Sequence, residues 1–237
     1  MLTDEPQLAD AFAALDEPGA GDPQPFTVEH FEAYARELIL DNLEHWEPEP
    51  FQLAFVADLF AGFPECWLVV PEGNGKTTLL AGVALYHADY RPGATVPIGA
   101  SSRDQCEVLH NQAGGFVRRT PGFRQRFRVY NGYRRIVGQR MESRIQVYAA
   151  DDRTGDGVIP TLSLLDELHR HRDLRLYRTW RGKLDKREGQ LVAISTAGEP
   201  GGEFETIRAT HRDTAGEITR RGVSHPAAAS AEAPDER

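Results

Sequence analysis

The sequence feature that most constrains the fold is a glycine-rich turn between an apolar run and a helix with apolar periodicity. The run covers residues 66–70, and apolar residues at positions 79, 80, 83 and 84 indicate the helix. Such a turn suits a phosphate chain, because successive backbone N–H groups point into one concave nest and the positive end of the helix favours an anion. The predicted nucleotide-binding residues of this turn are Gly73, Asn74, Gly75, Lys76, Thr77 and Thr78.

Several residues of the turn have distinct predicted roles. Lys76 can reach the β- and γ-phosphates, and the Thr77 hydroxyl can be a ligand of Mg²⁺. Gly73 and Gly75 permit backbone angles and a close approach that a Cβ atom would prevent. The strict P-loop pattern would place a glycine where Val70 stands. The turn alone is therefore also compatible with an ordinary glycine turn before a helix.

A second polar feature lies far along the chain, where the apolar run 161–165 ends in Asp166 and Glu167. In P-loop NTPases a strand of this kind lies near the P-loop strand, which brings its terminal aspartate beside Mg²⁺. Glu167 could then orient or deprotonate the attacking water as the catalytic carboxylate. The alternative is a helix N-cap followed by a favourable acid in the first turn. Together, the turn and the acidic pair favour binding of ATP with Mg²⁺.

Two further segments could serve the same site. Gln52, at the start of a predicted helix over residues 51–62, could contact the adenine edge if that helix packs beside the turn; an exposed polar residue in the first helical turn is the alternative. Ser195, Thr196 and Ala197 end a predicted strand over residues 190–194. Hydroxyl groups there could sense the γ-phosphate or the catalytic water, whereas the alternative is a turn into the next helix.

Composition and charge bound the class of protein. With 40% hydrophobic and 27% charged residues in 237, the chain is typical of one globular α/β domain, and we expect a cytoplasmic protein without membrane contact. Residues 1–25 and 215–237 are predicted to be a mobile segment and a loose tail around a domain at 26–214. The net charge of −9 argues against a passive nucleic-acid coat, yet nine arginines and a single acid, Glu142, occupy residues 118–144.

Periodicity predicts alternating strands and helices. Helices are expected over 27–43, 51–62, 101–119 and 202–209, and from 174 to an end between 182 and 189. Strands are expected over 66–70, 94–100, 144–149, 161–165 and 190–194. Pro97 is unfavourable for a central strand. Residues 127–137 are expected to form a hairpin around an Asn131-Gly132 turn, and residues 151–157 a loop. This pattern predicts a mostly parallel sheet with helices on both faces.

Several motifs, taken in order, resemble the large terminase subunits of tailed double-stranded DNA bacteriophages. Pro-Glu-Gly-Asn-Gly-Lys-Thr at 71–77 is similar to that family's Pro-Arg-x-Asn-Gly-Lys-Thr. The other matching stretches are Asp-Arg-Thr-Gly-Asp-Gly at 152–157, Leu-Leu-Asp-Glu-Leu-His at 164–169, and Ser-Thr-Ala-Gly at 195–198, which resembles the family's coupling motif.

The resemblance implies an additional-strand, RecA-like P-loop ATPase that drives double-stranded DNA into a procapsid. It implies partners as well: the portal protein, the small terminase subunit and further copies of the chain in a ring, in the host cytoplasm. By position, Lys76 and Thr77 would bind phosphate and Mg²⁺, and Asp166 would hold Mg²⁺ through water. Glu167 would be the catalytic carboxylate, and Gln52 would contact adenine.

The sequence departs from the family pattern at two points. Glu72 stands where these proteins usually carry an arginine, so another group must neutralise the charge that develops at the triphosphate. Arg134, Arg135 and Arg140 are the candidate arginine fingers. The alternative is that these arginines form a solvated or DNA-facing surface. Only 39 residues follow Gly198, too few for the family's nuclease domain, so we expect no nuclease activity. His169, next to the acidic pair, could relay between the nucleotide and DNA sites as in DExH helicases, or be a capped or surface histidine. A DExH-type helicase fragment and a non-catalytic relic P-loop domain are the alternative functions.

Overall fold

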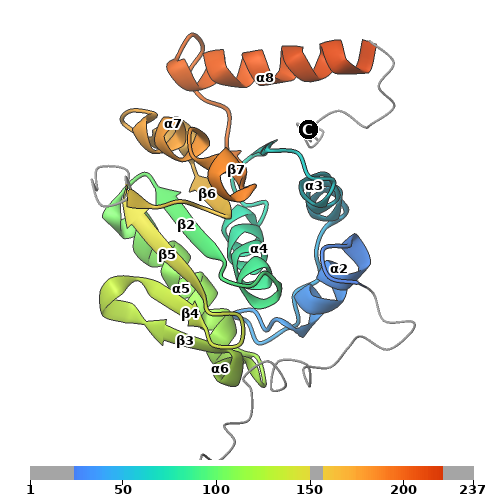
Figure 1. Ribbon diagram of the computed structural model, residues 1–237, viewed down its shortest axis with the longest axis vertical. Coiled ribbons are helices and arrows are strands. Elements are labelled where there is room, and N and C mark those ends of the chain that lie inside the picture. The colour runs from blue at the N-terminus through green and yellow to red at the C-terminus, as the bar shows by residue number, and fades with distance from the viewer. Residues whose placement is uncertain (1–23, 150–156, 221–237) are drawn as a thin grey trace, which may run out of the picture.

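The computed structural model describes residues 24–149 and 157–220, with side chains described as far as Arg212 (Figure 1). The predicted segment 1–25 and the expected loop at 151–157 lie almost wholly outside these residues. In the part of the chain that is described, no helix is both long enough and apolar enough to cross a membrane.

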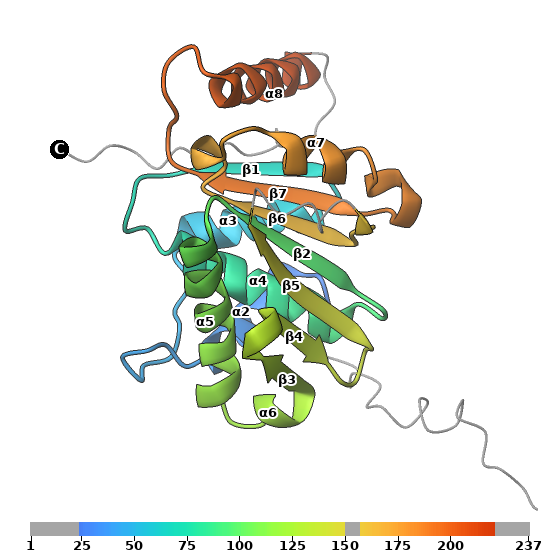
Figure 2. The same cartoon turned by 90° about the vertical axis from the view of Figure 1, so that its left-hand side faces the viewer.

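A single sheet of seven strands organises the described residues, in the order β1-β7-β6-β2-β5-β4-β3 (Figure 2). Five strands run parallel: β1 (Glu65–Val69), β7 (Gln190–Ser195), β6 (Leu162–Asp166), β2 (Thr95–Ala100) and β5 (Ser143–Ala149). Two antiparallel strands, β4 (Arg135–Gly138) and β3 (Phe127–Tyr130), extend it at one edge. The mostly parallel sheet is confirmed, and β7 lies between β1 and β6.

Helices cover both faces of the sheet, as predicted (Figures 1 and 2). On one face lie α2 (Val28–Glu37), α3 (Pro50–Phe60), α4 (Lys76–Tyr90), α5 (Arg103–Arg119) and α6 (Phe123–Arg126). On the other lie α7 (Arg175–Arg181), α8 (Glu203–Arg220) and the 3₁₀ turns η3 (Leu168–Arg170) and η4 (Leu184–Arg187). Along β1, Leu68 packs into the first core while Trp67 and Val69 pack into the second. Burial on both faces explains why β1, β2, β6 and β7 are mostly apolar runs.

The first helix is shorter than predicted. The pattern indicated a helix over 27–43, but α2 ends at Glu37, and Ile39 pairs with His45 in an isolated antiparallel bridge. Between them, the Asn42 side chain donates to Glu44 and accepts from the Glu44 backbone N–H, closing a tight turn. Local hydrogen bonds of this kind compete with helical ones, and here they end the helix about one and a half turns early.

The hairpin is confirmed, but its predicted turn is wrong. Tyr130 pairs with Arg135, so four residues connect the strands rather than the Asn131-Gly132 pair alone. Asn131–Tyr133 form a 3₁₀ turn, and Arg134 takes the left-handed conformation with φ of 47°. The strand pairing thus places the positive φ on an arginine, a choice that local sequence would not indicate.

Two other boundaries differ from expectation. Pro97 lies within β2 despite its missing N–H, because the ladder joining β2 to β6 begins one residue later, at Ile98. The helix predicted over 202–209 is α8, which continues to Arg220 and so into the segment predicted to be loose.

Candidate nucleotide-binding site

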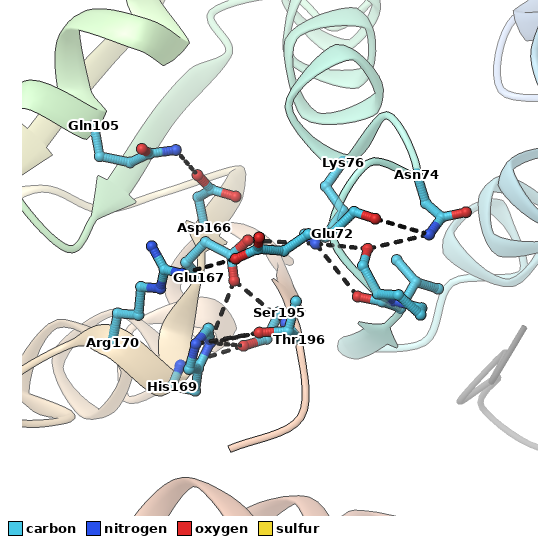
Figure 3. A network of polar contacts seen from close by, with 12 residues as sticks. Glu72, Asn74, Lys76, Gln105, Asp166, Glu167, His169, Arg170, Ser195 and Thr196 are labelled. Carbon is cyan, nitrogen blue, oxygen red and sulfur yellow. Dashed lines mark hydrogen bonds and ion pairs between the residues drawn. The ribbon is translucent and has the colours of Figure 1, made fainter. Parts of the chain in front are cut away.

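The carboxyl ends of three parallel strands bring the predicted site together (Figure 3). The glycine-rich turn leaves β1 and enters α4 at Lys76, β6 ends at Asp166, and β7 ends at Ser195. Because parallel strands end at the same edge of a sheet, these residues become neighbours although they are far apart in sequence. Ligands of open α/β sheets bind at this edge.

The glycine turn requires its glycines. Gly73 and Gly75 have φ of 86° and 65°, in the left-handed region, and a Cβ atom at Gly75 would lie 3.1 Å from Gln52 Nε2. The Asn74 side chain donates to the carbonyl oxygens of Pro71 at 3.2 Å and Glu72 at 3.4 Å, which closes the turn from within. The sequence therefore dictates the shape of this turn at several successive positions.

Lys76 joins the two predicted halves of the site. Its Nζ lies 3.4 Å from Glu167 Oε1, and it donates to the carbonyl oxygens of Val70 at 3.3 Å and Pro71 at 2.9 Å. The side chain is only 7% exposed, so the ammonium group sits within the turn, held by oxygen atoms. The predicted convergence of the lysine with the acidic pair is confirmed.

Asp166 is a buried carboxylate with one free acceptor. Its Oδ2 accepts a hydrogen bond from Gln105 Nε2 at 2.8 Å, whereas no partner of buried Oδ1 is found among the described residues. Burial raises the pKa of Asp166 to about 6, because the charged form has lost its water. An orphaned anionic oxygen fits a cation or a water molecule bound to one. Gln105 was not among the predicted site residues; its position in the first turn of α5, after the Ser102 cap, was the only signal.

Glu167 links the lysine to the end of β7. Its Oε1 faces Lys76, and its Oε2 lies 3.2 Å from His169 Nδ1 and accepts from the Thr196 N–H at 3.3 Å. The backbone of Glu167 has φ of 47°. A left-handed conformation at such a residue costs about 1–3 kcal/mol and is typical of functional positions. The conformation aims the carboxylate at the P-loop rather than along the strand.

The coupling segment is built into the same network. His169 Nδ1 lies 2.8 Å from Ser195 Oγ, and His169 Nε2 lies 3.1 Å from Thr196 Oγ1. Burial lowers the pKa of His169, against the opposing effect of Glu167, which favours a neutral ring able to accept a proton at one nitrogen and donate at the other. Thr196 and Ala197 also line a cavity of about 550 Å³ beside Pro71 and Glu72.

Gln52 lies against the P-loop but is already engaged. It is 3% exposed, so the alternative of an exposed residue in the first turn is wrong. Its Oε1 accepts from the Glu49 N–H at 3.0 Å in a capping box, and its Nε2 lies 3.5 Å from the Asn74 carbonyl oxygen. Its contact with adenine stays a prediction.

The two threonines after Lys76 occupy the first turn of α4. Both are partly exposed, and Thr78 Oγ1 accepts a hydrogen bond from Gln112 Nε2 at 3.4 Å. The role of Thr77 as a metal ligand stays a prediction.

The three candidate arginine fingers lie away from the P-loop. Arg135 donates to Gln146 Oε1 at 3.0 Å, and it lines with Arg134 a cavity of about 410 Å³ next to β5. Arg140 donates to the Asp89 carbonyl oxygen at 3.4 Å, near the carboxyl end of α4, whose amino end carries Lys76. At 1.5 Å per residue, that helix separates Arg140 from the P-loop by roughly 20 Å. Arg140 is therefore out of reach of this chain's own site, and the role of all three toward a neighbouring subunit stays a prediction.

These features define the class of the protein. A glycine turn entering a helix, a carboxylate pair at the end of a second strand and an extra strand between the two are the marks of an additional-strand P-loop NTPase. A profile of the family described as terminase large subunit, ATPase domain, matches residues 50–213. The chain belongs to this family, which favours the terminase interpretation over that of a helicase fragment.

Individual relatives agree with this assignment. The chain is 27% identical over 125 residues to the large terminase subunit of Enterobacteria phage HK97, an alignment that covers 50% of this chain and 25% of that protein. The crystal structure of the HK97 large terminase is similar with a TM-score of 0.74 at 20% identity, over 89% of this chain and 45% of that one. The ATPase domain of the Thermus phage P74-26 large terminase gives 0.59 at 16% identity, over 86% of this chain and 95% of that domain. The structural likenesses show the fold, and the chain spans less than half the length of the HK97 protein.

Proposed function

We propose that this chain is the ATPase motor module of a phage large terminase and couples ATP hydrolysis to movement of double-stranded DNA into a procapsid. The observation that carries the proposal is the contact of Lys76 with Glu167, next to the orphaned oxygen of Asp166. The proposed partners are double-stranded DNA, the portal protein of a procapsid, the small terminase subunit and further copies of the chain in a ring, in the host cytoplasm.

The residues present fit Mg²⁺ as well as ATP. Thr77 and Asp166 would hold the ion, which would neutralise charge on the phosphate groups. Gly73 to Thr78 would bind the phosphates, and Lys76 would leave Glu167 for the β- and γ-phosphates. That exchange frees Glu167 Oε1 to accept a hydrogen bond from the attacking water.

The coupling step follows from the second oxygen of Glu167. Oε2 is held by His169 and by the Thr196 N–H. Loss of the γ-phosphate and return of Lys76 to Glu167 would therefore change the hydrogen bonds at Ser195, Thr196 and Ala197. These residues lead into α8 through Gly198, whose N–H donates to Glu205 Oε1 at 2.7 Å. Movement would then pass from the nucleotide to α8.

The test is steady-state ATP turnover with and without double-stranded DNA, for the wild type, Lys76→Ala and Glu167→Gln. We expect Glu167→Gln to lower turnover by about 10²–10⁴-fold, as for loss of a general base, and Lys76→Ala to weaken ATP binding as well. Lys186→Ala and Glu107→Gln, at exposed positions, are the matched controls and should behave as the wild type. Equal turnover in all five proteins would contradict the proposal, and nucleotide binding without turnover in the wild type would favour a non-catalytic P-loop domain.

A further inference from the structure

An arginine absent from the sequence predictions lies at the mouth of the site. Arg170 Nη2 lies 2.8 Å from Oε1 of Glu72, the acidic residue within the P-loop. Arg170 is the last residue of η3, and its backbone N–H donates to the Glu167 carbonyl oxygen at 2.8 Å. Figure 3 shows its guanidinium group beside Glu167, joined by a dashed line to the Glu72 side chain, which extends from the glycine turn. A cation is thus tied by its backbone to the proposed catalytic residue and by its side chain to the phosphate loop.

The ion pair of Arg170 with Glu72 is weak enough for a stronger anion to replace Glu72. Arg170 and Glu72 side chains are 56% and 74% exposed, so solvent screens their attraction and ordering both long side chains opposes it. A triphosphate bound on the same loop would carry several negative charges beside the single charge of Glu72. Guanidinium groups bind phosphate oxygens through two parallel N–H donors, so the triphosphate would compete strongly for Arg170.

The second cation of the site also faces a carboxylate of this chain, although it is buried within the turn. Lys76 is paired with Glu167 as Arg170 is paired with Glu72. Two cations that a triphosphate could bind are therefore already close to the loop, and each is paired with a carboxylate of this chain. The negative charge of Glu72 in the P-loop then has a role, because it positions a cation in the absence of nucleotide.

From this geometry we infer that Arg170 is an arginine supplied by the chain to its own site, where it leaves Glu72 and binds the terminal phosphate of ATP. The inference rests on the proposed function. In the reaction the water oxygen bonds to the terminal phosphorus, and the bond from that phosphorus to the bridging oxygen breaks with its electron pair left on ADP. The water proton passes to Glu167. Arg170 exchanges no proton and offsets the charge that develops on the phosphoryl oxygens.

Other arginines are less suited to this role. Arg208 lines the cavity beside Glu72, but its Nε is held at 2.8 Å by Glu205 Oε2 within α8. It belongs to α8, which follows the coupling segment in the chain, whereas Arg170 belongs to η3, which follows Glu167. Arg208→Ala is therefore a useful comparison, because it removes a cation that lines the cavity beside Glu72 and leaves both Arg170 and Glu72 in place.

The test measures binding first and turnover second. Equilibrium dissociation constants for ADP and for a non-hydrolysable ATP analogue are compared in the wild type, Arg170→Ala, Arg170→Lys and Glu72→Gln, with Arg172→Ala as the matched exposed control. We expect Arg170→Ala to weaken binding of the ATP analogue at least tenfold and to leave ADP affinity within about threefold, because ADP lacks the terminal phosphate. Arg170→Lys should be intermediate, and Glu72→Gln should bind the analogue as tightly as the wild type or more tightly.

Turnover gives an independent readout. Loss of Arg170 should lower kcat about 10²–10³-fold, as for removal of one donor to a developing charge, and added guanidinium ion should restore part of it in Arg170→Ala. Equal losses in Arg170→Ala and Glu72→Gln, with no further loss in the double variant, would overturn the inference and leave an ion pair that only shapes the loop. A loss confined to Arg208→Ala would overturn it too. Wild-type behaviour of Lys76→Ala and Glu167→Gln, by contrast, would defeat the proposed function itself.

Discussion

The two ends of the sheet use charge in opposite ways. At the β1-β7-β6 end, cations face carboxylates of the same chain, Lys76 with Glu167 and Arg170 with Glu72. At the β5-β4-β3 end, Arg135 is paired with the neutral Gln146 and lies 5.9 Å from the Tyr133 ring. The charges at the first end are balanced within the chain, and in the proposed function its two cations exchange their carboxylate partners for a nucleotide. At the second end, Arg135 has no carboxylate partner among the described residues. A net charge of −9 therefore says little about where an anion would bind.

One exception sharpens the comparison. Arg126, the last residue of α6, is paired with Asp89 and lies 3.5 Å from Glu37. It stacks on Phe123 at 4.4 Å and on Tyr34 at 5.3 Å, so it ties α6 to α2 and α4. An arginine in the basic stretch can therefore be structural, and we expect only those near the hairpin turn to meet external anions.

The largest expected effect on stability concerns Asp166. Its pKa is raised from 3.8 to about 6 by burial, so the folded state holds its proton more tightly than the unfolded state does. The resulting loss of stability is absent below pH 4, grows as the pH rises from 4 to 6 and is complete above 6. Asp166→Asn should therefore raise the free energy of unfolding by up to about 3 kcal/mol at pH 8 and about half of that at pH 5.

Urea unfolding of wild type and Asp166→Asn at both pH values measures this difference. The same variant should lose Mg²⁺-dependent nucleotide binding, so that stability rises where function falls. If Asp166→Asn is less stable than the wild type at pH 8, the charged, buried carboxylate does not lower the free energy of unfolding as we infer.

A smaller effect on stability is expected from replacing one glycine at each end of the sheet, and only one of the two replacements should affect nucleotide binding. Gly75 and Gly122 both have positive φ, of 65° and 78°, but only at Gly75 would a Cβ atom meet a neighbour within 4 Å. Each alanine variant should destabilise the fold by about 1–2 kcal/mol through its left-handed backbone. Only Gly75→Ala should also weaken nucleotide binding, because the added Cβ pushes against Gln52. Thermal unfolding and nucleotide titration of both variants test this, and equal nucleotide affinity in the two would contradict it.

The smallest expected effect is at the hairpin. If this end meets the DNA backbone, Arg135→Ala should weaken DNA binding a few-fold and reduce the slope of log affinity against log salt by about one. ATP turnover without DNA should stay unchanged. A loss of basal turnover would point instead to an arginine finger reaching a neighbouring subunit.

Much of this arrangement could be predicted from the sequence. The P-loop, the acidic pair and the end of β7 each follow an apolar run, and parallel strands place such ends at one edge of a sheet. Gln105 and Arg170 could not be predicted, since each acts through a partner more than sixty residues away, Asp166 and Glu72. The early end of α2 was missed for a related reason: the local turn at Asn42 competes with an otherwise helical pattern.

The central claim is that Lys76 and Asp166 belong to one magnesium-nucleotide site. The most direct measurement is the dissociation constant of a fluorescent, non-hydrolysable ATP analogue, with Mg²⁺ and with chelator, for wild type, Lys76→Ala and Asp166→Asn. We expect Mg²⁺ to tighten binding of the analogue to the wild type. Lys76→Ala should bind the analogue at least tenfold more weakly than the wild type in both conditions. Asp166→Asn should not respond to Mg²⁺, and its affinity should equal that of the wild type in chelator. Identical affinities and an identical Mg²⁺ response in all three proteins would contradict the claim.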